Sequence, residues 1–513
     1  MRLSEMLHEI GNYEAGNDFL FKKYLQNEIK GACSDSRKIT SGYVFFCIKG
    51  ARFDGHYYAG DVIAKGCKIL VCEHMPAINI PNDVLVLTVA DSRKAYAKAL
   101  SGIYGHPDKK MCMIGITGTK GKTSTALMIK AILTQNNITA GYIGTNGIIF
   151  ADEHIQSGNT TPDSGDIYYY LSKMLSLNIR TVIIEVSSQA LWQSRVYGIK
   201  FDICIFTNIS EDHIGGYEHP SFEHYMNSKA LLFTDYNAKH IVYNADEKIF
   251  LPFFEKCPDS VLHPYSINSK AGFYADNIEL RRNGSDVGVD FTLHFDALQD
   301  SEKSIERKVS LSLPGEFNIY NALAAIIACR IAGVSIDRII RTLETVHIDG
   351  RFETVCLNSK PDTTFVIDYA HNGLSLEAVL KTAAEYSHNR IICVFGSVGG
   401  RTYGRRLELG KAAAKYADLS ILTADNPDCE AVPLITRDIK QAFIDADCEY
   451  KCMEIFDRTE AIKKAFEIAG KDDIVILAGK GHEKYQLISG ETVPFSEREI
   501  LLELDMTAAS IPN

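Results

Sequence analysis

The stretch from Met111 to Ser124 constrains the fold of this chain more than any other part of the sequence. It consists of Met-Cys-Met-Ile-Gly-Ile-Thr-Gly-Thr-Lys-Gly-Lys-Thr-Ser. The apolar beginning predicts a buried parallel strand, the glycines predict a tight turn, and the following residues are compatible with a helix to about Gln135. A strand, a glycine turn and a helix in this order are typical of an open α/β sheet with a ligand at the turn.

The turn of this stretch has the composition of a phosphate-binding loop. Its glycines let backbone N–H groups point toward a phosphate, and the N-terminus of the following helix adds partial positive charge. Lys122 is expected to reach the terminal phosphates of a nucleotide, and the hydroxyl of Thr123 is expected to ligate Mg²⁺. Ile116 occupies the first glycine position of the strict G-x-x-x-x-G-K-S/T pattern, so the prediction depends on the strand–turn–helix context. A plain structural turn is the alternative, and Gly-Lys-Thr at the helix start disfavours it.

Length and composition narrow the class of protein. The 513 residues predict roughly two to four domains, and a formal net charge of −11 argues against nucleic acid or an anionic membrane as partner. The 13 cysteines include no Cys-x-x-Cys pair, which favours reduced thiols in a cytoplasmic protein. The sequence begins without the pattern of a signal peptide, and no apolar run reaches the length of a membrane span. We therefore expect small molecules as partners.

Strand and helix patterns predict three α/β domains, with boundaries at 1–108, 109–347 and 348–513. The central domain is expected to contain a mostly parallel sheet, with antiparallel strands over 258–310 and a helix over Ala322–Ala332. The last domain is expected to be a Rossmann-like open sheet. In the first domain, Ser34 and Ser36 lie in a polar segment that is either an ordinary turn or a pocket suited to a nucleotide-sugar diphosphate.

Two polar residues in the central domain, Glu185 and His213, are candidate metal neighbours. Glu185 ends an apolar strand, where a doubly wound sheet presents side chains to its ligand, and a buried carboxylate there favours a Mg²⁺ contact. His213 follows the next predicted strand and is either a structural histidine or a neighbour of the same metal. Lys229 lies on an amphipathic helix next to an apolar run, and this local pattern is typical of a plain surface lysine.

The strands predicted in the last domain all end in polar or glycine-rich turns. Their sequences are Asp368-Tyr-Ala-His371, Gly396-Ser-Val-Gly-Gly-Arg401, Asp425-Asn-Pro-Asp428 and Gly479-Lys-Gly-His-Glu483. Since the carboxyl ends of parallel strands meet at one edge of the sheet, these turns predict a second ligand site. Upstream of this domain, Asn318 and Asn321 are one helical turn apart and are either helix caps or amides that contact a base.

Taken in order, these pieces resemble the Mur ligase family, in particular its members that add the third residue of the cell-wall peptide. The resemblance covers essentially the whole chain. The motifs that carry it are Thr117-Gly-Thr-Lys-Gly-Lys-Thr123, Asn159-Thr-Thr-Pro162, Glu185-Val-Ser-Ser188, Asp212-His213, Lys229, Gly315-Glu-Phe-Asn318 with Asn321, Gly350-Arg351, and the four turns of the last domain.

The resemblance implies a role for each matching residue. ATP would be bound by Gly118, Thr119, Lys120, Gly121, Lys122, Thr123, Ser124, Asn321, Arg351, Asp368 and Tyr369. The UDP-linked substrate would be bound by Ser34, Ser36, Asn159, Thr160, Thr161, Ser187, Gln193 and Arg195. The incoming amino acid would be bound by Arg401, Asp425, Asn426, Asp428, Gly479 and Glu483. Lys122, Lys229 and His213 would serve catalysis, and Mg²⁺ would be held by Thr123, Glu185, His213 and a carbamylated Lys229 formed with CO₂.

The implied activity is ATP-dependent amide synthesis on UDP-N-acetylmuramoyl-L-alanyl-D-glutamate, which proceeds through an acyl phosphate and uses a diamino acid as the amine. The resemblance also implies a cytoplasmic monomer that takes part in peptidoglycan synthesis. A ligase similar to folylpolyglutamate synthase is one alternative, and the first domain and the Asp-Asn-Pro motif argue against it. A phosphate-loop ATPase that is not a ligase is the other alternative, and it would turn over ATP without a second substrate.

Three positions depart from the usual family pattern, namely Lys120, Asn372 and Asp428. The first two leave the expectations above unchanged. Asp428 matters because family members that add diaminopimelate carry arginine directly after Asp-Asn-Pro, where it can bind the distal carboxylate. An aspartate there would repel that carboxylate and attract the ε-ammonium of lysine, so the sequence predicts L-lysine first and meso-2,6-diaminopimelate second. Arg405 or Arg437 could compensate for the missing arginine.

Overall fold

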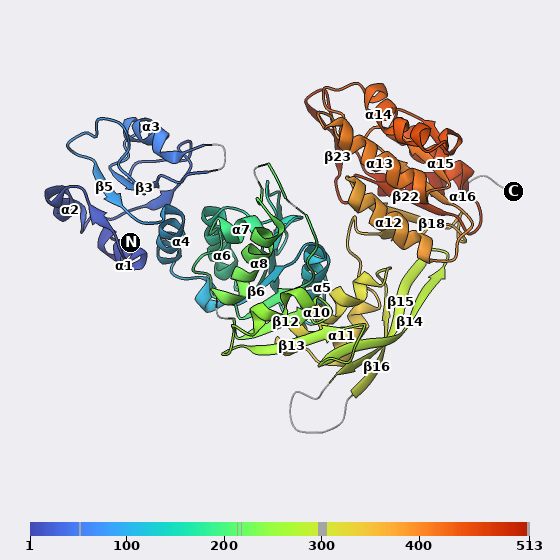
Figure 1. The fold of residues 1–513 in the computed structure, drawn as a ribbon, viewed down its shortest axis with the longest axis horizontal. Helices are drawn as coiled ribbons and strands as arrows, with labels where there is room; N and C mark the ends of the chain where they lie inside the picture. Colours follow the sequence, from blue (N-terminus) through green and yellow to red (C-terminus); the bar gives the residue numbers. More distant parts are fainter. Residues whose placement is uncertain (51–52, 213, 217, 237, 296–304, 510–513) are drawn as a thin grey trace. The chain divides into compact units, whose positions relative to one another are not determined.

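The computed structural model describes residues 1–50, 53–212, 214–216, 218–236, 238–295 and 305–509 (Figure 1). The chain separates into two compact units, and each is described by itself. The first unit comprises Met1–Phe273 and Leu323–Ile336, and the second comprises Tyr274–Ala322 and Asp337–Asn513. Among the described residues, no helix combines the length and the hydrophobicity that crossing a bilayer requires.

The first unit begins with a five-stranded sheet in the order β1-β5-β4-β3-β2, in which β1 is antiparallel to β5 and the other neighbours are parallel. The apolar runs Tyr43–Ile48, Lys68–Cys72 and Val84–Val89 predict three strands, which are confirmed to within two residues at each end. The pattern of Tyr57–Lys65 predicts a helix, and this segment instead begins as a short 3₁₀ turn. The strands are β1 Glu14–Ala15, β2 Gly31–Cys33, β3 Tyr43–Phe46, β4 Ile69–Cys72 and β5 Leu85–Thr88, and the helices are α1 Leu3–Ile10, α2 Asp18–Tyr24, η1 Gly55–Tyr58, α3 Ala59–Ala64 and α4 Ser92–Ile103.

The rest of the first unit is built on a sheet in the order β13-β12-β11-β6-β10-β7-β8-β9, in which β13 to β7 run parallel. Its central strands are buried on both faces, which explains why they appear in the sequence as continuous apolar runs. The strands are β6 Cys112–Thr117, β7 Ala140–Gly144, β8 Gly147–Phe150, β9 Glu153–Ile155, β10 Thr181–Glu185, β11 Ile203–Phe206, β12 His240–Asn244 and β13 Val261–Ser266.

Helices cross between these parallel strands. The glycine-rich stretch folds as predicted, because β6 is followed by the turn and then by α5. The helical elements of this part are η2 Asp108–Lys110, α5 Lys122–Gln135, α6 Ser164–Ser176, α7 Ser188–Trp192, α8 Phe222–Thr234, η3 Lys248–Phe250 and α9 Leu251–Phe254.

Two expectations for residues 258–331 are wrong in detail. The strand β13 was expected to be antiparallel, but it pairs parallel with β12 because the chain crosses over through η3 and α9 before it rejoins the sheet. The helix α10 spans Phe317–Ile331 and begins five residues before the predicted start at Ala322. Asn318 is therefore inside the helix, where its amide Nδ2 donates to the carbonyl of Pro314 at 2.7 Å. The helix α11, Ile336–Leu343, follows.

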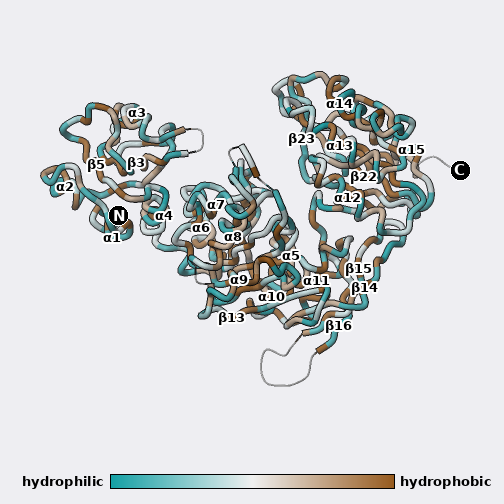
Figure 2. The backbone as a smooth tube through the Cα atoms, in the orientation of Figure 1, coloured by the Kyte–Doolittle hydropathy of each residue, from teal (hydrophilic) through white to brown (hydrophobic). Residues whose placement is uncertain are grey.

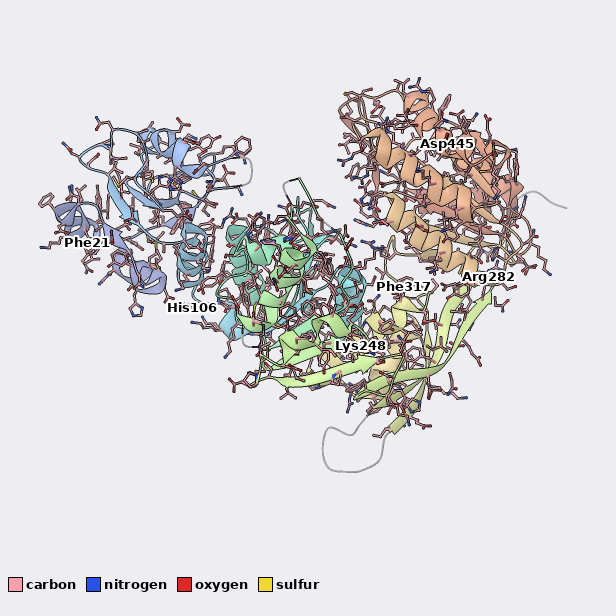
Figure 3. The ribbon with its side chains drawn as sticks, viewed as in Figure 1. Phe21, His106, Lys248, Arg282, Phe317 and Asp445 are labelled. Atoms are coloured by element: carbon pink, nitrogen blue, oxygen red, sulfur yellow. The ribbon has the colours of Figure 1, made fainter. Side chains whose placement is uncertain are left out.

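The second unit contains strands β14 Phe273–Asn283, β15 Asp286–Phe295 and β16 Ile305–Leu311, of which β15 and β16 are antiparallel as predicted. Arg282 on β14 fastens these strands to the last domain (Figure 3). Its guanidinium donates to the Thr364 hydroxyl at 2.9 Å and to the Asp473 carbonyl at 3.2 Å.

The last domain is the predicted open sheet, in the order β17-β18-β22-β19-β20-β21, with only β17 antiparallel among its described neighbours. Hydrophobic segments run along α10 and along central strands such as β22 (Figure 2). The strands are β17 Glu353–Val355, β18 Thr364–Asp368, β19 Ile391–Phe395, β20 Leu419–Leu422, β21 Cys452–Glu454 and β22 Ile474–Ala478, with a hairpin of β23 Tyr485–Ile488 and β24 Glu491–Pro494. The helices are α12 Gly373–Glu385, α13 Tyr403–Tyr416, α14 Val432–Asp445, η4 Glu449–Lys451, α15 Arg458–Ile468 and α16 Glu497–Ala509.

Candidate functional site

The loop between β6 and α5 is held in shape by the segment that follows β11. Gly118 and Gly121 have φ values of +149° and +82°, which L side chains rarely adopt, and Gly118 lies against the side chain of Thr207. The N–H groups of Thr119 and Lys120 donate to the carbonyl and the side-chain oxygen of Asn208, both at 2.9 Å. The loop is therefore fixed before any ligand binds.

Two lysines converge on this loop at a single oxygen atom. The Nζ atoms of Lys122 and Lys229 donate to the carbonyl of Gly118 at 2.8 and 2.9 Å. Lys122 also donates to the carbonyl of Thr119 at 3.0 Å. Lys229 is only 2 % exposed, so the interpretation of this residue as a plain surface lysine is wrong.

Burial sets the protonation of Lys229. It lowers the pKa of Lys229 well below the usual lysine value, and the charge of Lys122 lowers it further, while Asp212 acts in the opposite direction. The Nζ atom also lies 4.2 Å from the centre of the Tyr225 ring. A buried lysine with a depressed pKa is an amine with a nucleophilic lone pair.

Glu185, at the carboxyl end of β10, is fully buried and organises the space beside the loop. Its Oε2 atom accepts hydrogen bonds from the hydroxyls of Thr123 at 3.0 Å and Thr145 at 3.2 Å. Its Oε1 atom accepts from the Thr145 N–H at 3.1 Å and from the Tyr142 hydroxyl. These four donors compensate the burial of the carboxylate. The carboxylate in turn fixes the position of the Thr123 hydroxyl at the start of α5.

The same glutamate connects the loop to the Asn-Thr-Thr-Pro segment. The hydroxyl of Thr161 donates to the Glu185 carbonyl at 2.7 Å and accepts from the Ser187 N–H at 3.0 Å. The Thr160 and Thr145 hydroxyls lie 3.2 Å apart. The structure thus brings Lys122, Thr123, Glu185, Thr160 and Thr161, which are distant in sequence, into one contact network.

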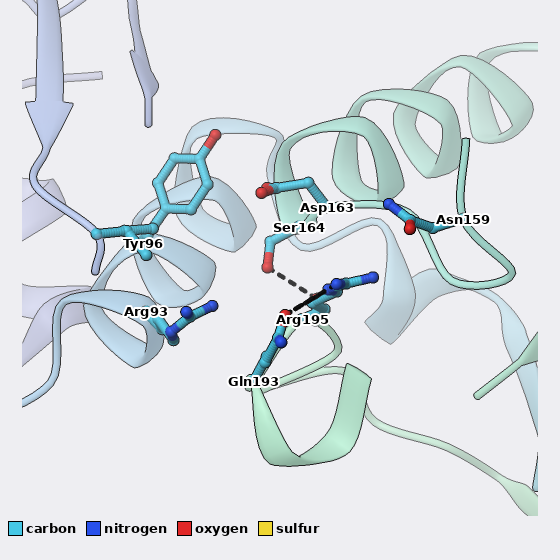
Figure 4. Close-up of a pocket in the computed structure, with 8 residues that line it drawn as sticks. Arg93, Tyr96, Asn159, Asp163, Ser164, Gln193 and Arg195 are labelled. Carbon is cyan, nitrogen blue, oxygen red and sulfur yellow. Dashed lines mark hydrogen bonds between the residues drawn. The ribbon is translucent and has the colours of Figure 1, made fainter. Parts of the chain in front are cut away.

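A pocket lies beside this network (Figure 4). Arg195 is held across it by the Thr161 carbonyl, to which its Nη1 donates at 2.8 Å, and by the Gln193 side-chain oxygen, to which its Nη2 donates at 2.8 Å. Asn159, Gln193 and Arg195, all predicted from the sequence, line this pocket. Its full lining is Ile48, Arg93, Tyr96, Asn159, Asp163, Ser164, Gln193 and Arg195.

Sequence reasoning missed Arg93, which enters the pocket from α4. The guanidinium donates to the Lys49 carbonyl at 2.6 Å, and burial lowers the pKa of Arg93. Arg195 also has a pKa that is lowered by burial, and Asp163 has one raised by burial. Two half-buried arginines beside a carboxyl group whose pKa is raised would suit an anionic ligand. Arg93 follows the carboxyl end of β5 by a few residues. Because ligands bind at that end of parallel strands, this position in the sequence could have identified Arg93 as a candidate binding residue.

Three other predicted site residues of the first unit are Ser34, Ser36 and His213, and neither serine is among the residues that line the pocket. Ser34 lies near Tyr96, which lines the pocket. The carbonyl of Ser36 accepts from Lys65 Nζ at 2.8 Å. His213 lies outside the described residues.

In the second unit, the segment from Gly350 to Phe352 is hydrogen-bonded to the residues at the end of β18. The N–H of Tyr369 donates to the Gly350 carbonyl at 2.9 Å, and Asp368 accepts from the N–H groups of Phe352 and Ala370 at 2.7 and 2.8 Å. Burial raises the pKa of Asp368, and the nearby Arg351 opposes that effect. The guanidinium carbon of Arg351 lies 5.8 Å from the Tyr369 ring centre. Asn321, in the same unit, donates to the Asn318 side chain at 2.9 Å.

The ends of β20 and β22 form a compact polar cluster in the second unit. The buried ammonium of Lys480 donates to Asn426 Oδ1 at 2.8 Å and to Glu483 Oε2 at 2.6 Å. Asn426 Nδ2 donates to the same Glu483 oxygen at 3.0 Å. Gly479 has a φ of +116°, and a Cβ atom there would approach Asp425 Oδ2 to 3.0 Å. Burial raises the pKa of Asp425, while Arg458 and Lys480 oppose the rise.

Asp428 has a structural role that its sequence motif did not reveal. It adopts a φ of +51°, and its Oδ1 accepts a hydrogen bond at 2.9 Å from the N–H of Gly490 in the turn between β23 and β24. Its own N–H donates to the Leu487 carbonyl at 2.9 Å. The carboxylate is therefore engaged by the hairpin, and this weakens the prediction that it attracts an ammonium group.

The structure thus combines a preorganised glycine-rich loop on a mostly parallel sheet with an open α/β sheet in the second unit that has a polar edge, and this is the architecture of a phosphate-loop enzyme. Three family models match the chain: "Mur ligase family, catalytic domain" over 28–104, "Mur ligase middle domain" over 116–329, and "Mur ligase, glutamate ligase domain" over 350–481. The chain belongs to the Mur ligase family, and the three-domain α/β fold predicted from the sequence is confirmed.

Similar proteins in several bacteria are named UDP-N-acetylmuramoyl-L-alanyl-D-glutamate–2,6-diaminopimelate ligase. The relative in Clostridium botulinum is 36% identical over 95% of this chain and 97% of its own length. The relative in Caldanaerobacter subterraneus subsp. tengcongensis is 38% identical over 98% and 99%, and that in Aquifex aeolicus is 36% identical over 94% of each. The predicted resemblance to the tripeptide-forming ligases is confirmed. L-lysine as the preferred amino acid is not supported, because diaminopimelate, our alternative, matches these names better.

Solved structures agree with this assignment of the fold. A structure named for the same 2,6-diaminopimelate ligase matches with a TM-score of 0.69 at 27% identity, over 95% of this chain and 97% of the other. A folylpolyglutamate synthase from Mycobacterium tuberculosis matches with a TM-score of 0.56 at 16% identity, over 81% and 95%. The second similarity shows a shared fold alone.

Proposed function

We propose that the chain catalyses the ATP-dependent addition of 2,6-diaminopimelate to UDP-N-acetylmuramoyl-L-alanyl-D-glutamate. The observation that carries the proposal is the convergence of Lys122, Lys229, Thr123 and Glu185 on one preorganised loop, connected through Thr161 to the pocket of Arg195. This arrangement supports a site for nucleotide phosphates beside a site for an anionic substrate. The names of the similar proteins supply the substrates.

The reaction has two steps in this proposal. A carboxylate oxygen of D-glutamate attacks the γ-phosphorus of ATP, so that an acyl phosphate forms and ADP leaves. The amine of the diamino acid then attacks the acyl carbon, phosphate leaves, and the nitrogen loses a proton. Lys122 and the N–H groups of the loop stabilise the charge on the transferring phosphoryl group. A carboxylate alone is a poor electrophile in water, which explains the need for phosphorylation.

The chain's own groups around the loop fit a magnesium ion. Thr123 offers a hydroxyl whose proton is already donated to Glu185, so its lone pairs are free to face the loop. Oxygen donors of this kind suit Mg²⁺, which would neutralise charge on the phosphates when bound. Glu185 keeps the Thr123 hydroxyl in place through a carboxylate that accepts four hydrogen bonds.

Lys229 fits the role of a carbamylated residue in this proposal. Its depressed pKa favours the neutral amine, which is the form that adds to CO₂ with loss of one proton to give a carbamate. The modification would place a negative charge beside Lys122, and the two groups would then attract each other. An oxygen of the carbamate is a suitable ligand for Mg²⁺.

The remaining predicted contacts complete the proposal. ATP would also contact Gly118, Thr119, Lys120, Gly121, Ser124, Asn321, Arg351, Asp368 and Tyr369. The UDP-linked substrate would contact Ser34, Ser36, Asn159, Thr160, Thr161, Ser187, Gln193 and Arg195, and the diamino acid would contact Arg401, Asp425, Asn426, Gly479 and Glu483.

An assay with a panel of diamino acids tests the proposal. The purified enzyme with ATP and the UDP-linked dipeptide should use meso-2,6-diaminopimelate at least about tenfold better in kcat/KM than L-lysine or L-ornithine, because one extra buried carboxylate contact discriminates by that order. Tripeptide formation that prefers L-lysine would overturn the choice of diaminopimelate. ATP hydrolysis that needs neither the dipeptide nor an amine would overturn the ligase itself and favour a plain ATPase.

Arg93 provides a separate prediction for the UDP-linked substrate. Replacing it with alanine should raise the KM for this substrate about tenfold to a hundredfold, since a charge-assisted contact contributes about 1.5–3 kcal/mol. The KM for ATP should stay within about twofold of the wild-type value. Arg180→Ala, which alters an exposed arginine of the same unit, is the matched control. An unchanged KM for the UDP-linked substrate would show that Arg93 serves only the structure of α4.

A further inference from the structure

Arg405 lies near the carboxyl edge of the sheet in the last domain. It is the third residue of α13, which begins a few residues after β19 ends at Phe395. The strand β19 lies between β20 and β22, and the turns after those two strands carry Asn426 and Glu483. Arg405 therefore starts from the same edge as the residues predicted to bind the amino acid.

The guanidinium of Arg405 is poorly satisfied by the protein. Its Nη2 donates to the His371 carbonyl at a long 3.4 Å, and its buried Nε has no hydrogen-bond partner. Among the described residues, no carboxylate lies within ion-pair distance of Arg405. The Nε atom of the adjacent Arg406 also lacks a partner, but its Nη atoms donate to both Glu430 oxygens at 2.8 and 2.6 Å and to Asp438 at 2.9 Å.

Two other cations near this edge are paired with carboxylates. Lys480 pairs with Glu483 at 2.6 Å, and Arg458 pairs with Glu497 at 2.7 Å. Burial and the charge of the neighbouring Arg401 lower the pKa of Arg405, while Asp425 partly opposes them. The charges of Arg401 and Asp425 thus both act on Arg405. Asp428 does not neutralise the two arginines through its Oδ1, which accepts from Gly490.

We propose that Arg405, together with Arg401, binds the distal carboxylate of the incoming diamino acid and so determines the preference for it. The proposal rests on the diaminopimelate ligase activity proposed above. A guanidinium binds a carboxylate through two parallel hydrogen bonds, which would supply the partner that the buried Nε lacks. The chain would thereby recognise the carboxylate from α13 although an aspartate follows its Asp-Asn-Pro motif.

Steady-state kinetics of the full-length enzyme with meso-diaminopimelate and with L-lysine test this assignment. Arg405→Gln should raise the KM for diaminopimelate about tenfold to a hundredfold, while the KM values for ATP and the UDP-linked dipeptide stay within about twofold. Arg405→Lys, which keeps the charge but loses the planar fork, should fall between wild type and Arg405→Gln. With L-lysine, which lacks the distal carboxylate, Arg405→Gln should keep or gain kcat/KM.

The matched control is Arg437→Gln, because the Arg437 side chain is 72% exposed and its nearest acidic partner, Asp438, is 3.8 Å away. An Arg405→Gln enzyme with an unchanged ratio of diaminopimelate to lysine, or with an equal loss for both, would overturn the assignment of Arg405. A wild-type enzyme that rejects diaminopimelate would instead overturn the proposed function, so the two failures are distinguishable. Thermal melting of each variant shows that the fold is retained.

Discussion

Replacing Lys122 with alanine should reduce ligation by roughly a few hundredfold while the protein stays folded. The ammonium already lies in the loop, 2.8 Å from the Gly118 carbonyl, and it needs only a short movement to reach a phosphate oxygen. Its charge is of most use where negative charge develops on the transferring phosphoryl group, and removing one such contact costs about 3–4 kcal/mol. The loop should keep its shape because Thr119, Lys120 and Asn208 hold it through other hydrogen bonds.

The measurement is kcat/KM at saturating dipeptide and diamino acid over a range of ATP concentrations. Lys200→Ala, which removes an exposed lysine of the same unit, should behave like the wild type. Near-wild-type turnover by Lys122→Ala at saturating ATP would show that this lysine does not act on the phosphates.

Replacing Lys229 with alanine should remove most activity, on the order of a hundredfold or more, and millimolar short carboxylic acids should restore part of it. The expectation follows from burial: the side chain is 2 % exposed, its pKa is lowered, and alanine leaves a cavity beside Gly118 that formate or acetate can enter. A bound carboxylate would replace the carboxylate-like group of the carbamate.

Lys229→Met is the matched control, because methionine fills the same space with a neutral chain and leaves no room for a carboxylic acid. It should be as inactive as Lys229→Ala and should not respond to formate. Full activity in Lys229→Ala without added acid would contradict a role in catalysis. Inactivity of the alanine variant without any rescue would contradict the carbamate and leave the lysine itself as the active group.

Much of the fold could be predicted because its strongest signals are local. The parallel strands are buried on both faces, so they stand out as short apolar runs, and the polar turns that follow them mark the ligand edge. The phosphate loop and Glu185 were predicted in this way, whereas the Asn159–Thr161 segment was predicted from the resemblance to the family. The direction of β13 was predicted wrongly because a half-exposed strand alternates polar and apolar residues in both parallel and antiparallel sheets. Only the path of the chain between β12 and β13 determines whether the two strands run parallel.

What escaped prediction depends on contacts between distant residues. Arg93 belongs to no motif, and its importance comes from a pocket shared with Arg195, a residue 102 positions away by the chain's own numbering. The burial of Lys229 follows from how α8 packs on the phosphate loop, which an amphipathic pattern does not show. The lysine preference was inferred from Asp428 as a free charge, whereas the hairpin after β22 uses that carboxylate to hold its turn.

The carboxylate of Glu185 has a consequence for how this enzyme could escape an inhibitor. The side chain accepts from the Thr123 hydroxyl of the phosphate loop and from the Thr145 hydroxyl, which lies 3.2 Å from the Thr160 hydroxyl of the substrate segment. A substitution there would disturb both ligand sites at once, so an excess of neither substrate would compensate for it. A compound that contacts this corner would therefore face a target with few viable resistance mutations.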